Sequence, residues 1–216
     1  MHFLANLATV VVRPRSTMAR ILETSPRNWT VWLLFALTAI SGIFGDVDAP
    51  MVGQVLEQTG GVGITLIVVG VLAGLIVLLP VLFWFYAYVP VFVGRFLGGK
   101  GEIRGVRAAL AWGLAPAIWA LLYRVPAALW FSASSATSVR MRNGNVAFEP
   151  GIIAEGCGVA LFFAFLELMV FVWCAFVMSN TLGEAHGFTS WHGLGTLVIA
   201  AIAPLVVVLA AVLAVT

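Results

Sequence analysis

The chain has 216 residues, of which 62% are hydrophobic and only 9% charged, and its net charge is +2. Globular domains carry about 25% charged residues, and a soluble domain of this size cannot hide so much apolar surface behind a polar shell. The composition therefore excludes a disordered chain, a secreted disulfide scaffold and a nucleic-acid-binding protein with a broad basic face. It indicates a polytopic integral membrane protein.

The first 27 residues are predicted to form a cytoplasmic amphipathic segment. Apolar residues recur there at helical spacing, first from Phe3 to Val11 and then from Met18 to Leu22, with arginines between the two stripes. Helices of this kind lie in the membrane interface with their apolar face against lipid.

Five long apolar runs follow in residues 28–216, which we take as one membrane domain. A helix needs about 20 apolar residues to cross the hydrocarbon of a bilayer, and unpaired backbone groups cannot face lipid. No strand-like alternation is present, so the predicted fold class is all-α. The predicted spans cover about 28–45, 64–97, 108–131, 156–182 and 193–215.

The run 64–97 admits two interpretations, one long kinked helix or two short ones. With one helix, the basic cluster before the first span and the cluster from Arg95 to Arg107 lie on the same side of the membrane. With two helices, the second cluster would lie outside. Because basic residues collect on the cytoplasmic side, we expect five spans, an inner amino terminus and an outer carboxyl terminus.

Basic residues of the inner side form a predicted cytoplasmic face, with Glu184 and His186 of the last inner loop beside it. Near an anionic leaflet each basic residue contributes on the order of 1 kcal/mol of attraction. Anionic lipid head groups are therefore expected partners, although the same charges could serve only to set topology during insertion. The members of this basic face are Arg13, Arg15, Arg20, Arg27, Lys100, Arg104 and Arg107.

Two charges, Arg124 and Glu167, lie inside predicted spans, where charge is costly unless it is paired or faces water. Counted along their helices, they lie about 10 Å and about 16 Å below the outer boundary. An arginine side chain can close that difference, so we expect an ion pair between the third and fourth spans. The pair could join two helices or line a proton or solute path; alternatively, Arg124 could extend outward to the interface alone.

Motifs for chemistry are weak. The stretch from Gly94 to Gly101 is similar to a phosphate-binding loop, but Gly101 stands where the loop needs Ser or Thr, and a helix end is expected instead. Ser41 as a nucleophile would lie roughly a bilayer away from His186 and His192. Glu184 and the two histidines lack the spacing of strong zinc motifs.

We therefore assign no catalytic, cofactor-binding or metal-binding residue, and we expect no cofactor and no nucleic-acid partner. Gly70 and Gly74 have the spacing of a helix-packing motif, which suits self-association or contact with another protein. Glycine is common in this chain, so the pair indicates close packing without naming a partner.

Three segments together resemble the Yip family of Ypt-interacting proteins. The first runs from Arg13 to Leu22, and the second joins residues 97–101 to Arg104 and to the alanine-rich third span with Pro116. The third covers residues 182–189, ahead of the last span. The resemblance extends over nearly the whole chain, and it implies five spans, an inner amino terminus and a short outer tail.

Eukaryotic members of the family lie in the early secretory pathway and bind Rab-type GTPases, which is what the resemblance would imply for a eukaryotic chain. This chain lacks the long hydrophilic amino-terminal region of those members, which leaves GTPase binding in doubt. It is more similar to prokaryotic members, and its ten arginines to one lysine suit a GC-rich genome. We therefore expect the cytoplasmic membrane of a prokaryote.

Two classes of function are favoured over an enzyme. The first is a non-enzymatic membrane scaffold or interaction protein that works through its basic cytoplasmic face. The alternative is a small transporter, channel or flux facilitator for a solute or lipid, which would use Arg124 and Glu167. An enzyme is the least favoured class because the spans hold few groups capable of acid, base or nucleophilic chemistry.

Overall fold

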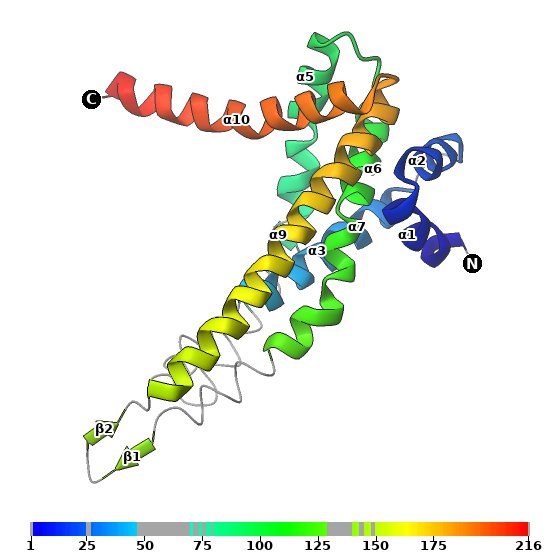
Figure 1. Cartoon of the computed structure of the whole chain (residues 1–216). Helices are drawn as coiled ribbons and strands as arrows, with labels where there is room; N and C mark the ends of the chain where they lie inside the picture. Colours follow the sequence, from blue (N-terminus) through cyan, green and yellow to red (C-terminus); the bar gives the residue numbers. More distant parts are fainter. Residues whose placement is uncertain are drawn as a thin grey trace.

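The structure, a computed structural model, describes residues 2–24, 27–46, 70, 74, 77–78, 80–128, 140–142, 145–147 and 150–215. These residues form helices, apart from one short hairpin at the far end of the molecule (Figure 1). In the hairpin, β1 (Arg140–Arg142) pairs antiparallel with β2 (Asn145–Ala147). The all-helical fold class is thus confirmed in its main part, with this hairpin as an addition.

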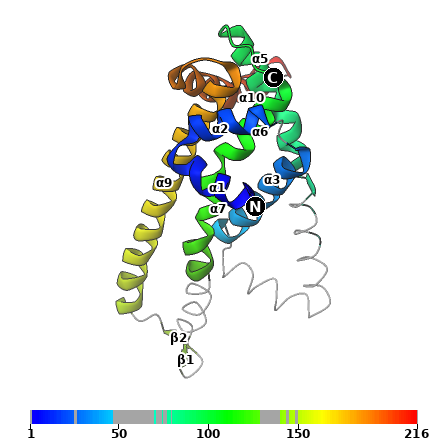
Figure 2. The same cartoon turned by 90° about the vertical axis from the view of Figure 1, so that its right-hand side faces the viewer.

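Two helices, α1 (His2–Val12) and α2 (Pro14–Glu23), form the amino-terminal segment. The break falls at Arg13 because Pro14 can begin a helix but cannot continue one. Both helices lie across the bundle rather than along it (Figure 2). Their inward faces are buried, through Leu7 and Val10 on α1 and through Met18 and Ile21 on α2.

The middle of the chain supplies shorter helical pieces. A bend of 46° separates Ile103–Trp119 from Leu121–Ala128. Just before the bend, Pro116 has no backbone N–H, so one helical hydrogen bond is missing there. The pieces with labels are α3 (Asn28–Asp46), α5 (Tyr88–Phe96), α6 (Ile103–Gly113) and α7 (Ala115–Trp119). Before α5 the structure describes a helical stretch continuously from Pro80.

Among the described residues the last two helices are the longest, α9 (Pro150–His186) and α10 (Ser190–Val215). They join through a tight turn in which Gly187 has a φ of +73°, a conformation that glycine adopts without strain. After this turn α10 passes α5 and runs crosswise to α9, and its carboxyl-terminal end projects away from the other helices (Figure 1).

Among the described residues, fewer than five helices are long and apolar enough to cross a membrane. One helix, Gly158–His186, is long and apolar enough by itself, and the bent pair 103–119 with 121–128 would make a second if it counts as one span. Of the other predicted spans, 28–45 and 193–215 coincide with α3 and α10, in which the apolar segments that count toward a crossing, Asn28–Gly42 and Ser190–Ala203, are too short for one. Most of residues 64–79 lies outside the described part. The number five is therefore not established by the structure.

Burial changes abruptly along α9. From Gly158 to Phe176 the residues are mostly exposed, with Phe171 at 70% of its possible surface, whereas Leu182 has 0%. We call the exposed part, Gly158–Phe176, the stem. We call the opposite end of the molecule, where residues 177–186 meet α2 and the 97–102 loop, the capped end.

Candidate functional site

The two charges inside the predicted spans meet on the stem. The Arg124 Nε donates to Glu167 Oε1 at 2.8 Å, and Nη2 donates to Glu167 Oε2. The third nitrogen, Nη1, donates to the carbonyl and the hydroxyl oxygen of Ser41 at 3.0 and 2.9 Å. The Ser41 hydroxyl in turn donates to the carbonyl of Ala117. We call this group the charge clamp.

The clamp joins three separate parts of the chain. Ser41 comes from α3, Arg124 from the helix 121–128, and Glu167 from α9. A bidentate arginine–carboxylate pair is strong and fixes geometry in two directions. The Arg124 side chain is only 13% exposed and the Glu167 side chain 39%. All three guanidinium nitrogens are engaged, which is the arrangement of a structural bridge.

A second ion pair lies at the capped end. The Arg15 Nε donates to Glu184 Oε2 at 3.1 Å, and Arg15 Nη2 donates to the carbonyl of Phe188 at 3.2 Å. These contacts tie α2 to the turn between α9 and α10. Because Arg15 is about half exposed, the pair contributes little by itself to folding free energy. Its effect is to fix the position of α2.

The imidazole of His186 lies buried against three glycines of the 94–101 stretch. A Cβ at Gly94 would come within 2.2 Å of the ring, and one at Gly101 within 2.5 Å. The other side of the ring stacks on Phe188, with ring centroids 5.1 Å apart. The Lys100 amide donates to the His186 carbonyl at 3.0 Å. Neither ring nitrogen has a hydrogen-bond partner among the described residues.

This packing explains the glycine-rich stretch that is similar to a phosphate-binding loop. The stretch follows helix α5, and Gly98 terminates that helix with a φ of +88°. Its remaining glycines leave room for the imidazole rather than for a phosphate. The residues weighed as metal ligands are engaged elsewhere: Glu184 pairs with Arg15, and His192 Nδ1 lies 2.8 Å from the hydroxyl of Thr189.

One predicted member of the basic face, Arg107, does not lie on the surface. Arg107 is buried, with its guanidinium 3.8 Å from the centroid of the Trp84 ring and its Nε donating to the Trp84 carbonyl at 3.2 Å. Stacking on an aromatic ring suits a delocalised cation, so Arg107 belongs to the packing between α6 and the helix that begins at Pro80. The other members are exposed, namely Arg13, Arg15, Arg20, Arg27, Lys100 and Arg104.

Two tryptophans hold α1 against the bundle. The Trp119 indole donates to the Leu7 carbonyl at 3.3 Å, and the Trp173 indole donates to the Val11 carbonyl at 3.2 Å. The second bond satisfies one of the carbonyls that the end of a helix leaves without a partner. The outward face of α1 remains apolar, with Leu4 and Val12 each about three-quarters exposed.

Sequence reasoning missed several of these residues. Ser41 was considered only as a nucleophile, and Trp119 and Trp173 were not considered at all. Three consecutive polar residues, 179–181, stand inside a predicted span, where polar groups mark a functional or packing site. That signal would have pointed to the capped end. Gly70 and Gly74 are exposed, and a Cβ at either position would meet nothing within 4 Å.

Exposed apolar helices, an internal ion pair and a polar capped end define a helical membrane protein. A model of the Yip1 domain matches residues 8–213, and the chain belongs to this Yip1 domain family. The family resemblance predicted from the three sequence segments is thereby confirmed. No curated protein and no solved structure matches the chain.

Proposed function

We propose that this Yip1-domain protein is a non-enzymatic membrane scaffold whose working surface is the basic face of the capped end. The observation that carries the proposal is the contrast between the two outward faces of the amino-terminal helices. On α1 the large outward residues are apolar, as with Leu4 and Val12, whereas on α2 the outward residues include Arg15 and Arg20. With a lipid boundary at the level of α1, the apolar face of α1 contacts hydrocarbon and the arginines of α2 contact head groups and water.

The stem supports the same boundary. Its exposed apolar residues end at Phe176, and Trp173, which bonds to the end of α1, lies one turn before it. Tryptophan is enriched at the membrane–water interface. With the boundary there, the stem lies in hydrocarbon and the arginines of α2 lie at the level of lipid head groups, where anionic lipids attract them.

The contacts of the capped end support a docking role. Arg15 joins α2 to the turn after α9, and His186 joins that turn to the 97–102 loop. These segments are therefore held in one arrangement, and they carry exposed basic side chains such as Arg15 and Lys100. Pre-organised surfaces bind partners at a lower entropic cost than mobile ones.

The proposal includes five spans in the cytoplasmic membrane of a prokaryote, with the amino terminus inside. Cysteine-accessibility labelling tests it. In intact cells Arg104→Cys is expected to react only with reagents that enter the cytoplasm, and Arg140→Cys with reagents that do not enter. Labelling of position 104 from outside would overturn this topology.

The transporter is the second candidate, and the exposure of Glu167 is the observation in its favour. A carboxylate with 39% of its side chain exposed could take up a proton from a path along the stem. The clamp weighs against this role because Arg124 holds both carboxylate oxygens. Proton uptake would have to break a bidentate pair, so the scaffold is the better-supported function.

Charge removal at the basic face tests the scaffold. Arg13, Arg20, Lys100 and Arg104 are changed together to Gln, and Arg107 is left in place because it is buried. Co-purified anionic lipids and partner proteins are expected to fall several-fold in quantitative mass spectrometry of the full-length protein, since each charge contributes on the order of 1 kcal/mol.

The matched control is Arg140→Gln with Arg142→Gln, which removes charge from the hairpin at the opposite end. It is expected to keep the lipids and partners of the parent protein. If the four-charge variant also keeps them, with its topology unchanged, the basic face has no docking role and the transporter gains support.

A further inference from the structure

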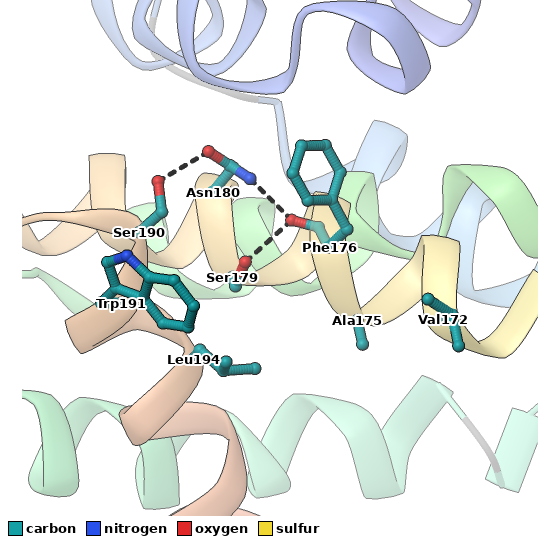
Figure 3. A pocket seen from close by; sticks show the side chains of 8 residues that line it. All are labelled: Val172, Ala175, Phe176, Ser179, Asn180, Ser190, Trp191 and Leu194. Atoms are coloured by element: carbon teal, nitrogen blue, oxygen red, sulfur yellow. Dashed lines mark hydrogen bonds between the residues drawn. The ribbon is translucent and has the colours of Figure 1, made fainter.

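A groove runs between α9 and the start of α10, with a volume of about 410 Å³ (Figure 3). This volume lies within the range of about 300–1,000 Å³ that small-molecule sites occupy. The groove follows one face of α9 from Val172 to Asn180 and is bounded on the other side by Trp191 and Leu194. It therefore straddles the point where the stem meets the capped end.

The two ends of the groove differ in polarity. Towards the stem its lining is apolar, with Val172 and Ala175 on α9 (Figure 3). Towards the capped end it has Asn180, which is 8% exposed, and Ser190. The Ser190 hydroxyl donates to Asn180 Oδ1 at 2.7 Å, and Asn180 Nδ2 donates to the Phe176 carbonyl at 2.8 Å.

These polar groups keep capacity for a ligand. An amide side chain can make four hydrogen bonds, two as donor and two as acceptor, and a hydroxyl has two acceptor lone pairs. The structure gives the Asn180 side chain two bonds and engages the Ser190 hydroxyl as a donor. One N–H of Asn180 and the lone pairs of Ser190 are left, which suits a group that both donates and accepts.

None of the residues that line the groove is charged. A carboxylate or phosphate head group would find no cation there, whereas a hydroxyl would find both a donor and an acceptor. Trp191 stands at the groove with 80% of its surface exposed and offers an apolar ring with one further donor. The chemistry favours a neutral head group over an anionic one.

We propose that this groove binds one acyl chain of a neutral, hydroxyl-bearing lipid such as a monoacylglycerol. The hydroxyl head group bonds to Asn180 and Ser190, and the chain lies along Ala175 and Val172 towards the stem. The order of polarity agrees with the bilayer, because the head group then lies at the boundary and the tail in hydrocarbon. The site rests on the membrane location in the proposed function and is independent of the basic face.

Photocrosslinking tests this site on the full-length protein in nanodiscs. The probe is a monoacylglycerol with a diazirine in its acyl chain, and labelled peptides are identified by mass spectrometry. The label is expected on residues 172–194, and excess unlabelled monoacylglycerol is expected to lower it at least fivefold in the parent protein. The competition needs no variant, so a folding defect cannot imitate its result.

Two variants locate the chain and the head group. Ala175→Trp fills the groove and is expected to lower labelling at least fivefold, whereas Leu161→Trp, on the exposed stem, is expected to leave it unchanged. Asn180→Leu is expected to weaken labelling by the monoacylglycerol but not by the same probe with methylated hydroxyls.

Three outcomes would overturn the proposal. The first is a label spread evenly over the exposed faces of α9 and α10 and insensitive to competition. The second is a label that Ala175→Trp leaves in place. The third is stronger labelling of the groove by a diazirine fatty acid, because an anionic head group contradicts the neutral lining. Loss of the basic-face charges is expected to leave the groove labelling unchanged, which separates this site from the proposed function.

Discussion

The helix α9 runs through both the stem and the capped end, yet its side chains have opposite surroundings in the two regions. Phe171 and Phe176 of the stem are mostly exposed, whereas Leu182, at the capped end, is fully buried. In the stem the apolar side chains need no protein partner, because lipid is as apolar as they are. At the capped end the same helix packs on α2, α6 and α10.

The difference teaches where the specificity of the fold resides. Among the described residues the stem has few packing contacts, so we infer that its position depends on polar groups, above all the charge clamp. The capped end depends on close contact between backbones, at positions such as Gly113 and Gly193, where a Cβ would meet α9. Charge removal should therefore damage the stem, and added volume should damage the capped end.

The largest expected effect is that of Arg124→Ala. Removing one partner of a buried pair costs about 3–5 kcal/mol, and the exposure of Glu167 places this variant near the lower value. We expect the free energy of unfolding in detergent to fall by about 3 kcal/mol, since Glu167 and the Ser41 carbonyl both lose their donor.

A double-mutant cycle sharpens this prediction. Arg124→Leu together with Glu167→Leu leaves no charge behind, and the pair should recover much of the loss. Strictly additive losses from the two single changes would show that the two side chains act independently, against the geometry of the clamp.

The second effect is steric, at the crossing of α9 and α10. A Cβ at Gly193 would lie 2.0 Å from the Ser179 carbonyl oxygen and 2.8 Å from the Gly183 amide nitrogen. Backbone atoms cannot turn aside as a side chain can, so Gly193→Ala should destabilise by about 3 kcal/mol, at the upper end of overpacking costs.

Gly195 provides the matched control on the same helix. A Cβ there would meet nothing within 4 Å, so Gly195→Ala should stabilise slightly, because alanine favours a helix by about 1 kcal/mol over glycine. Equal thermal midpoints for the two variants in one detergent would contradict the close crossing.

The smallest effect concerns α1, which lies between the two regions. Trp173→Phe keeps an aromatic side chain, although a smaller one, and removes the donor to the Val11 carbonyl. We expect a loss of about 1 kcal/mol, the usual net value of one hydrogen bond. Hydrogen exchange should also speed up in residues 3–12 more than in α2, which Arg15 holds separately. Unchanged exchange in that segment would show that α1 is held without the Trp173 bond, by its apolar contacts and the Trp119 bond to Leu7.

The amino-acid sequence predicts the helical class, the family and the meeting of Arg124 with Glu167, because each depends on a property visible along one chain. Composition gives the class, and helical rise gives the depth of each charge. The pairing needs only depths on neighbouring helices that differ by no more than an arginine side chain can reach, so it is accessible without a structure.

The burial of Arg107 and the site of His186 were not accessible in the same way. Arg107 reads as one of several surface charges, and only the contact of α6 with Trp84 shows that an aromatic ring covers it. The glycines around His186 are separated from it by more than 80 positions in the chain. Local spacing carries no information on such a contact, and glycine alone permits several structures.

The bond between Trp173 and Val11 has a consequence for synthesis of the protein, because 162 positions separate the two residues. At about 5–20 residues per second, roughly 10–30 s pass between the appearance of α1 and that of its indole partner. During that interval α1 can pack on α2 and later on α7, but the Val11 carbonyl has no indole donor. The carboxyl-terminal end of α1 therefore completes its hydrogen bonds only after α9 has been made.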